Sequence, residues 1–367
     1  MKIVNVVGAR PNLIKIASII KEMNRCDEFN YILLHTGQHY DYDMSQVFFK
    51  DLSLPEPDIY LNVGSGNHAT QTAKVMVEFE KFALDWQPDL VLVVGDVNST
   101  LACAITSSKL NIPIAHVEAG LRSFDRTMPE EINRIVTDAL STFLFTTSRD
   151  ANSNLRREGI SEDKMFFVGN VMIDTLLAFR EQALKSSILE QFNLIADSYL
   201  LLTLHRPSNV DDKNVFEGIL RAIKEIQHDI PVLFPIHPRT TQRVQHFGLD
   251  NLVKTMPGLK ITKPLGYLDF LHVMANARIV LTDSGGIQEE TTILGVPCLT
   301  LRESTERPIT VTCGTNRIIG TNPTRIVMET KHSLTSGQMT NGKIPELWDG
   351  KASQRITDII LKHQRLL

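Results

Sequence analysis

Ser284, Gly285 and Gly286 stand between an apolar, β-branched segment (277–281) and a helical pattern (287–294). The apolar segment is typical of a buried strand, so these three residues form a strand-to-helix turn. Backbone N–H groups at the start of a helix lack partners within the helix and attract anions, and glycine lets a phosphate approach them closely. We expect this turn to bind a phosphate, although a tight turn without a ligand would have the same sequence.

Charged side chains near two predicted helix starts could complete a site for a nucleoside diphosphate. Glu290 lies one turn into the helix that follows Gly286, within reach of a ribose diol, and Arg307 lies in a loop that follows the next strand. Arg10 and Lys15 flank the start of another helical pattern (13–23). The helix dipole disfavours cations at a helix start, so a bound anion would explain them. Ordinary solvated surface charges would have the same sequence.

Two carboxylates follow apolar strands of the first half. Asp96 comes after the strand at 89–94 and Glu118 after the strand at 112–117, and Glu130 begins a helix shortly afterwards. Neighbouring parallel strands end at the same edge of a sheet, so we expect the first two carboxylates to converge, as general acid/base pairs do. Asp96 could instead cap a helix, and Glu130 could serve only as ordinary helix-start chemistry.

Two histidines lie at the ends of predicted strands in the second half of the chain. His205 is followed by an arginine, and His237 is followed by a proline and an arginine. His205 ends the strand at 198–204, and His237 ends the strand at 231–236. Buried core histidines would be expected within strands rather than at both tips, so ligand binding is the favoured interpretation. Neither histidine has acidic or thiol partners at ligand spacing, so no metal is expected.

Length and composition narrow the class of protein. The 367 residues, with 43% hydrophobic and 22% charged residues, indicate a globular protein of two domains. The net charge of −4 argues against nucleic acid as a partner, and no apolar run is long enough to span a membrane. Four scattered cysteines predict reduced thiols, and the N-terminus begins as a strand rather than as a signal peptide, so we expect a cytoplasmic protein.

Strand and helix patterns alternate along both halves of the chain. This alternation predicts an α/β fold with two doubly wound, Rossmann-like domains that face each other across a cleft. We expect the first domain at residues 1–168 and the second at 169–352, with a final helix at 353–367 that packs on the first. Carboxylates in one domain and a phosphate site in the other predict chemistry at an atom attached to, or next to, that phosphate.

Taken together, the motifs resemble the non-hydrolysing UDP-N-acetylglucosamine 2-epimerases from residue 2 to about residue 320. The resemblance implies the GT-B fold, cytoplasmic residence and a homodimer. It also implies interconversion of UDP-GlcNAc and UDP-ManNAc for surface polysaccharide, with no metal or other cofactor. The motifs that carry it are Gly8-Ala9-Arg10-Pro11, Thr36-Gly37-Gln38-His39, Gly95-Asp96-Val97-Asn98-Ser99-Thr100, His116-Val117-Glu118-Ala119-Gly120-Leu121-Arg122, Pro129-Glu130-Glu131, His205-Arg206, His237-Pro238, Asp283-Ser284-Gly285-Gly286 and Thr305-Glu306-Arg307-Pro308.

The resemblance also implies a mechanism and residue roles. UDP leaves C1 as the C2 proton is removed, which gives 2-acetamidoglucal, and UDP adds again after protonation of the opposite face. By similarity, the acid/base residues are Asp96, Glu118 and Glu130, in no assigned order. The groups that stabilise the departing diphosphate are His205, Arg10, Lys15 and Arg307. The remaining substrate contacts are Ser284, Gly285 and Gly286 at phosphate, Glu290 at the ribose, Phe270 at the uracil, and His237.

One departure from the family pattern bears on regulation and on substrate. Members that a second UDP-GlcNAc activates carry an arginine in the region 66–71, whereas this chain has no Arg or Lys between Lys50 and Lys74. Gln38 and His39 are the residues at which such regulation would act. The variant also resembles epimerases of UDP-2,3-diacetamido-glucuronic acid. A GT-B glycosyltransferase, a hydrolysing epimerase and a non-catalytic nucleotide-sugar sensor are the rival functions.

Overall fold

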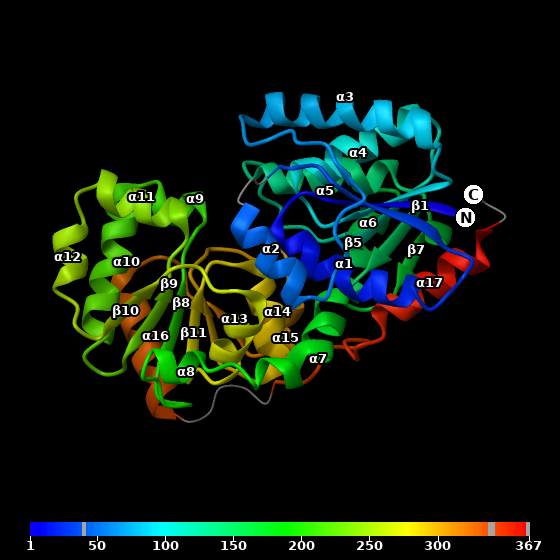
Figure 1. Cartoon of the computed structure of the whole chain (residues 1–367). Helices are drawn as coiled ribbons and strands as arrows, with labels where there is room; N and C mark the ends of the chain where they lie inside the picture. Colours follow the sequence, from blue (N-terminus) through cyan, green and yellow to red (C-terminus); the bar gives the residue numbers. More distant parts are fainter. Residues whose placement is uncertain (39–41, 337–341, 365–367) are drawn as a thin grey trace. The chain divides into compact units, whose positions relative to one another are not determined.

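The computed structural model describes residues 1–38, 42–336 and 342–364 (Figure 1). The chain divides into two compact units, unit 1 (Met1–Ala178 with Glu346–Leu367) and unit 2 (Phe179–Pro345). Unit 1 ends inside helix α7 (Val171–Ala183) at Ala178, ten residues after the boundary expected at 168, and unit 2 ends at Pro345, seven residues before the boundary expected at 352. The first half of α7 belongs to unit 1 because Asp174 accepts hydrogen bonds from the backbone of Ala352 and Ser353.

Unit 1 is built on a seven-stranded parallel sheet in the order β3-β2-β1-β4-β5-β6-β7. Its central strands consist almost wholly of buried apolar residues, because helices cover both faces. The strands are β1 (Lys2–Val7), β2 (Asn30–His35), β3 (Ile59–Tyr60), β4 (Leu90–Val94), β5 (Ile114–Ala119), β6 (Phe143–Thr146) and β7 (Met165–Phe167).

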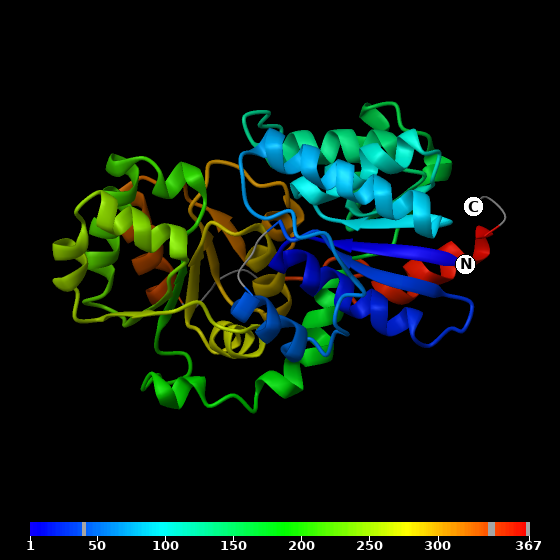
Figure 2. The ribbon, with the colours of Figure 1, turned by 45° about the horizontal axis from the view of Figure 1, so that its top comes forward.

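In unit 1, α3, α4 and α5 lie on one side of the sheet, and α1 and α17 lie together on the other (Figures 1 and 2). Helix α1 begins at Arg10, three residues earlier than its apolar periodicity suggests, because Pro11 is well suited to the first turn of a helix. The helices are α1 (Arg10–Met23), α2 (Tyr42–Asp51), α3 (His68–Trp86), α4 (Asn98–Lys109), α5 (Pro129–Leu140), α6 (Arg149–Arg157), a 3₁₀ turn (Glu162–Lys164), α7 and α17 (Ala352–Lys362).

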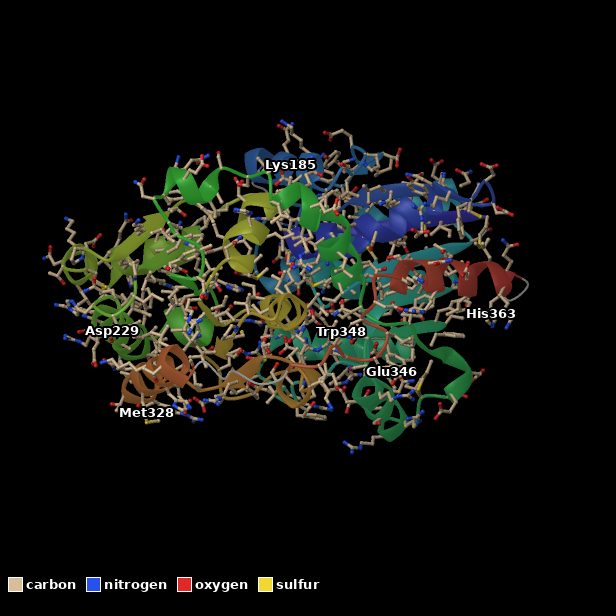
Figure 3. The ribbon with its side chains drawn as sticks, turned by 90° about the horizontal axis from the view of Figure 1, so that it is seen from below. Lys185, Asp229, Met328, Glu346, Trp348 and His363 are labelled. Carbon is tan, nitrogen blue, oxygen red and sulfur yellow. The ribbon has the colours of Figure 1, made fainter. Side chains whose placement is uncertain are left out.

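The C-terminal segment returns to unit 1 through specific contacts (Figure 3). The indole of Trp348 is buried and donates a hydrogen bond of 2.9 Å to the carbonyl of Thr147. His363, at the end of α17, packs edge-on against Phe143 and Phe166. The burial of these rings anchors α17 beside α1.

Unit 2 repeats the architecture with a six-stranded parallel sheet in the order β10-β9-β8-β11-β12-β13. Helices α10 and α16 pack together on one side, and α13 and α14 lie on the other (Figure 1). The strands are β8 (Leu200–Thr203), β9 (Val232–Pro235), β10 (Leu259–Thr262), β11 (Ile279–Thr282), β12 (Cys298–Thr300) and β13 (Asn316–Ile318). The helices are α8 (Ile188–Gln191), α9 (Pro207–Val210), α10 (Lys213–Ile226), α11 (Pro238–His246), α12 (Asp250–Lys254), α13 (Tyr267–Ala275), α14 (Gly285–Leu294), α15 (Ile309–Thr312) and α16 (Pro323–Ser336).

The predicted α/β class with two doubly wound sheets is therefore confirmed. In each sheet the strand order reverses at one point, between β1 and β4 in unit 1 and between β8 and β11 in unit 2. Ligands of such sheets bind outside the carboxyl ends of the strands at these points. In the described part of the chain, the helices are too short or too polar to cross a membrane.

Candidate active site

The turn after β1 is locked against the turn after β4 in unit 1. Asn12 accepts hydrogen bonds from the backbone of Gly8 and Ala9, and its amide donates 2.9 Å to the carbonyl of Val94. A Cβ on Gly8 would lie 2.2 Å from the hydroxyl oxygen of Ser99, so only glycine fits there. The turn that carries Arg10 is thus fixed beside the turn that leads to Asp96.

Lys15 and Glu118 form a buried ion pair. The ammonium nitrogen of Lys15 lies 2.7 Å from Glu118 Oε1, and the two side chains are 5% and 2% exposed. Glu118 has a left-handed backbone (φ +74°) at a break in the pairing of β5 with β6, which turns its carboxylate away from the regular register. Lys15 therefore holds a carboxylate, a partner that the sequence reasoning did not anticipate.

Asp96 belongs to a second ion-pair cluster on α5. Arg134 contacts Asp96 and also Glu131, with nitrogen–oxygen distances of 2.5 Å to each. Glu131 in turn accepts hydrogen bonds from the backbone of Ser123 and Phe124. Burial alone would raise the pKa of Glu131, but these bonds and Arg134 lower it overall, so Glu131 stays ionised. The cluster orients Asp96, whose side chain is 20% exposed.

In unit 2, a buried carboxylate orients His205. Asp283 lies 3.0 Å from His205 Nδ1 and accepts hydrogen bonds from the backbone of His205 and Arg206. Burial would raise the pKa of Asp283, but His205 and these N–H groups lower it. Nδ1 of His205 thus faces an ionised carboxylate, and the His205 side chain is 40% exposed, so the ring is open to a ligand.

The predicted phosphate turn is the start of α14. Ser284 is the N-cap of this helix, and Gly285 is its first residue. A Cβ on Gly285 would lie 2.4 Å from a guanidinium nitrogen of Arg307 and 2.7 Å from a carboxylate oxygen of Glu306. Arg307 pairs with Glu306 and with Glu289 of α14. A guanidinium and a helix N-terminus thus meet at one place, as in anion sites of proteins.

Glu290 lies deeper in α14 and is nearly fully buried. Tyr267 donates a hydrogen bond of 3.3 Å to its carboxylate. Burial raises the pKa of Glu290 to about 8. The group is therefore mostly protonated at neutral pH and can donate as well as accept a hydrogen bond.

Comparisons with known proteins identify the family of this chain. The sequence model of the family described as UDP-N-acetylglucosamine 2-epimerase matches residues 21–361. The chain is 45% identical to the UDP-N-acetylglucosamine 2-epimerase of Methanocaldococcus jannaschii over 365 residues, which cover 98% of this chain and 99% of that protein. The chain belongs to the UDP-N-acetylglucosamine 2-epimerase family.

A solved structure and a second relative are described by the nucleotide sugars that they bind or act on. A crystal structure of the Methanocaldococcus jannaschii enzyme in complex with UDP-GlcNAc and UDP superposes with a TM-score of 0.93 at 45% identity, over 99% of this chain and 100% of the other. The UDP-2,3-diacetamido-2,3-dideoxy-D-glucuronate 2-epimerase of Pseudomonas aeruginosa is 40% identical over 365 residues, covering 99% of this chain and 100% of that protein. The family and the isomerase class expected from the sequence motifs are confirmed.

The remaining predicted site residues lie on α5 of unit 1 and at or within α11, α13 and α14 of unit 2. Glu130 lies partly exposed in the first turn of α5, on the helix that carries Arg134. His237 is the N-cap of α11, and its ring lies 6.1 Å from that of His205. Phe270 is half-buried on α13, and Gly286 follows Gly285 in α14.

Gln38, expected at a regulatory site, has an internal role in the structure. Its side-chain oxygen accepts hydrogen bonds from the backbone N–H and the hydroxyl of Ser99, at 3.0 and 2.7 Å. Gln38 is 6% exposed and thus caps the first turn of α4. His39 lies outside the described residues. The regulatory assignment of Gln38 and His39 stays an expectation from the resemblance.

No role was assigned from the sequence to four residues of these clusters, Asp283, Arg134, Glu131 and Glu306, although all except Arg134 lie in the motifs that carry the resemblance. Asp283 had a visible signal, because it directly precedes the phosphate turn at the end of a strand.

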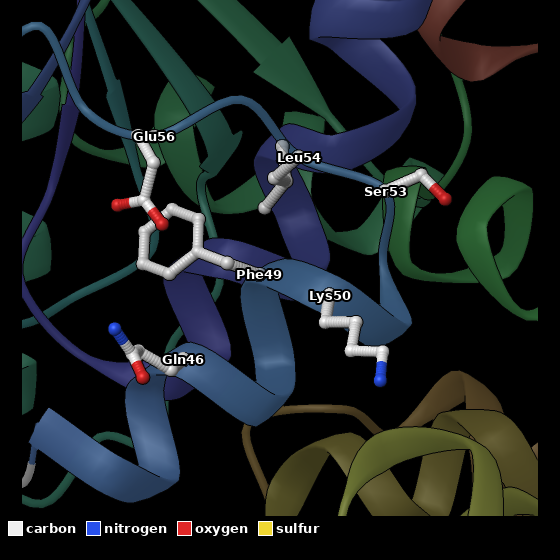
Figure 4. A pocket seen from close by; sticks show the side chains of 6 residues that line it. All are labelled: Gln46, Phe49, Lys50, Ser53, Leu54 and Glu56. Atoms are coloured by element: carbon white, nitrogen blue, oxygen red, sulfur yellow. The ribbon is translucent and has the colours of Figure 1, made fainter.

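Within the described residues, no three His, Cys, Asp or Glu side chains gather as they would around a metal ion. A hollow of about 450 Å³ on unit 1, lined by Phe49, Lys50 and Glu56 among others, contains none of the predicted site residues (Figure 4).

Gly285→Ala is expected to weaken UDP binding at least about tenfold. The added Cβ must displace Arg307 or Glu306, and a displaced guanidinium loses a charge-assisted hydrogen bond worth about 1.5–3 kcal/mol. Titration calorimetry with UDP measures the effect. Gly66→Ala is the control, because a Cβ there meets nothing within 4 Å. Equal UDP affinity in Gly285→Ala and wild type would remove Gly285 from the phosphate site.

Glu290→Gln is expected to stabilise the ligand-free enzyme increasingly as pH rises. The pKa of Glu290 is raised from 4.5 to about 8 on folding, so its contribution to stability is full below about pH 4.5 and is lost as pH rises toward about 8. The loss approaches about 1.4 kcal/mol per pH unit in that window. Glutamine has no proton to lose there. The melting temperature of the variant minus that of wild type should increase between about pH 5 and about pH 9.

The matched control for this titration is Glu78→Gln, on a glutamate that pairs with Lys81 at the surface of unit 1. Its melting-temperature difference from wild type should stay flat over the same range. A flat difference for Glu290→Gln as well would show that Glu290 is ionised in the folded enzyme throughout.

Proposed function

We propose that this epimerase interconverts UDP-GlcNAc and UDP-ManNAc by inverting C2 of the sugar. The single observation that carries the proposal is the pair of anchored carboxylates at the ends of β4 and β5, Asp96 with Arg134 and Glu118 with Lys15. Inversion of a C–H centre needs a base on one face and an acid on the other. The 45% identity to a UDP-N-acetylglucosamine 2-epimerase over nearly the whole chain supports the substrate.

The reaction proceeds by elimination and re-addition of UDP. The C2 proton is not adjacent to a carbonyl carbon of the ring, so simple enolisation is unavailable. A carboxylate takes the C2 proton, the C–H electrons form the C1–C2 double bond, and UDP leaves C1 with the C–O bonding pair. The intermediate is 2-acetamidoglucal. Protonation of C2 from the opposite face and attack of the UDP oxygen at C1 complete the epimerisation.

In this mechanism the acid/base residues are Asp96, Glu118 and Glu130, which take and return the C2 proton. The anchored geometry of the first two supports their role, because both carboxylates are held at fixed positions by a cation. Lys15 pairs with Glu118 and, with Arg10 in the fixed turn after β1, stabilises the departing diphosphate.

The residues of unit 2 bind the UDP moiety and stabilise its departure. Negative charge on the β-phosphate rises as the C1–O bond breaks, so hydrogen-bond donors at that position accelerate the step. His205, the start of α14 with Ser284, and Arg307 supply these donors. The remaining contacts are Gly285 and Gly286 at phosphate, Glu290 at the ribose hydroxyls, Phe270 at the uracil, and His237 beside His205. The enzyme works without metal or nicotinamide as a cytoplasmic homodimer and supplies ManNAc units for surface polysaccharide.

A second substrate is favoured by one observation. The chain is 40% identical, end to end, to a UDP-2,3-diacetamido-2,3-dideoxy-D-glucuronate 2-epimerase. Elimination at C1 and C2 does not involve C3 or C6, so the same carboxylates could epimerise either sugar. The two substrates differ in what must be accommodated at C3 and in a negative charge at C6.

Proton NMR of the purified enzyme with each nucleotide sugar tests the proposal. We expect UDP-GlcNAc to give UDP-ManNAc, and to turn over faster than the diacetamido-uronate. Turnover of the diacetamido-uronate alone would establish the second substrate. Free ManNAc with UDP would place the enzyme among the hydrolysing epimerases, and transfer of the sugar to an added acceptor would make it a glycosyltransferase.

A further inference from the structure

A mostly buried chain of ionisable side chains in unit 1 has no direct part in the proposed chemistry. It runs from His116 on β5 through Asp138 on α5 to Arg122 and then to Glu158 at the end of α6. His116, Asp138 and Arg122 are all at most 2% exposed. Buried charges are costly, so a chain of them in one place requires a reason.

Asp138 is the centre of this chain. Its Oδ1 lies 2.6 Å from His116 Nδ1, and its Oδ2 lies 2.7 Å from a guanidinium nitrogen of Arg122. The backbone N–H of Gly120 also donates 3.0 Å to Oδ2. Burial would raise the pKa of Asp138, but His116 and Arg122 lower it below its ordinary value. Both carboxylate oxygens of Asp138 therefore have fixed partners, His116 at Oδ1 and Arg122 with the Gly120 N–H at Oδ2.

His116 carries the connection onward to the turn after β4. Its Nε2 lies 2.9 Å from the carbonyl oxygen of Gly95, the residue before Asp96. The two ring nitrogens of His116 thus face two acceptors, the Asp138 carboxylate and the Gly95 carbonyl. The ring therefore bridges Asp138 and the backbone of the turn that leads to Asp96.

Asp138 therefore reaches both turns that carry the proposed acid/base carboxylates. It holds the turn of Asp96 through His116 and Gly95, and it holds the end of β5 directly through Gly120, two residues after Glu118. We propose that Asp138 is a positioning residue that sets the spacing of Asp96 and Glu118 for epimerisation. This inference rests on the proposed function of those two carboxylates.

The reaction is sensitive to that spacing. One group must reach the C2 proton and another must reach the opposite face of the same carbon, so an error of about 1 Å at either can cost on the order of 10²-fold in rate. If re-protonation is slowed, the intermediate has time to leave. Faulty spacing should therefore show itself in released UDP and 2-acetamidoglucal as well as in a lower rate.

The chain offers a matched control in Asp174. This carboxylate is also buried in unit 1 and also holds backbone N–H groups, those of Ala352 and Ser353 of α17. Its bonds anchor the C-terminal helix and do not reach the turns of Asp96 or Glu118. Asp174→Asn thus reports the cost of losing a buried structural carboxylate without a change in the spacing.

The experiment compares Asp138→Asn and Asp174→Asn below their melting temperatures. Both should melt earlier than wild type. Only Asp138→Asn should lose kcat, by about 10- to 100-fold, with KM and UDP affinity within about threefold of wild type. It should also release a larger fraction of UDP and 2-acetamidoglucal per epimerisation, as followed by NMR.

The second variant is His116→Asn, which removes the connection from Asp138 to Gly95 and keeps the hydrogen bond from Gly120 to Asp138. It tests the positioning role if Asp138→Asn does not fold. It should lower kcat in the same manner, and combining it with Asp138→Asn should add little. Wild-type kcat and product partition in either folded variant, relative to Asp174→Asn, would reduce Asp138 to a structural role. A wild-type enzyme that does not epimerise would instead overturn the proposed function.

Discussion

Asp96→Asn is expected to lower kcat by about 10²-fold or more while the enzyme still binds UDP. Asparagine keeps the shape of the side chain but can neither take nor return the C2 proton, and loss of a positioned acid or base costs about 10²–10⁴-fold. UDP binding should persist because the proposed ribose and uracil contacts, and most of the proposed phosphate contacts, lie in unit 2. Epimerisation rates by NMR and calorimetric titration with UDP measure the two quantities.

The same strand supplies a control for this experiment. Asp89 lies at the amino end of β4 and accepts a hydrogen bond from the backbone of Lys2. Asp96 lies beyond the carboxyl end of the same strand. Asp89→Asn should retain near wild-type kcat. If Asp96→Asn also kept wild-type turnover, Asp96 would not be an acid/base residue of this enzyme.

Asp283→Asn is expected to lower kcat by about 10²-fold through His205. The carboxylate of Asp283 faces Nδ1 of His205, and an asparagine amide in its place can present a donor to that nitrogen and turn the ring or favour the other tautomer. The β-phosphate would then lose an oriented donor as its charge develops. The loss should appear in kcat rather than in KM. Steady-state kinetics with UDP-GlcNAc measure it.

Coupling between the two residues separates orientation from general damage to unit 2. If Asp283 acts through His205, the double variant with His205→Gln should be about as slow as the slower single variant, because residues that act as a unit are non-additive. Asp211→Asn, on a carboxylate that pairs with Arg239 and Arg243 at the surface of unit 2, is the control. Fully multiplicative losses would show that Asp283 and His205 act independently.

Much of the fold could be predicted from local patterns. The buried strands of parallel sheets are short apolar runs, and β4 and β8 have sharp boundaries in the sequence for that reason. Polar residues directly after such runs, such as Asp96 and Glu118, lie at strand ends in the structure. The start of α14 at Gly285 was also visible, because an N-cap serine and glycines follow an apolar strand.

The pairing of charges could not be predicted in the same way. Lys15 and Glu118 are neighbours only because β1, β4 and β5 lie side by side in the sheet. The local pattern around Lys15 indicated a phosphate as its partner, whereas the fold places a carboxylate there. Asp138 cannot be predicted from the sequence because a single acidic residue within a helix has no local signature. Its partners His116 and Arg122 do lie in a motif that resembles the family.

The central claim, inversion of C2 through loss of its proton, is tested most directly by proton NMR of the enzyme with UDP-GlcNAc in D₂O. The mechanism predicts that UDP-ManNAc forms with deuterium at C2 and that the remaining UDP-GlcNAc gains deuterium at C2 as equilibrium is approached. UDP-ManNAc that retains its original C2 hydrogen would contradict the account, because the proton would then never have left the sugar for a carboxylate in exchange with solvent.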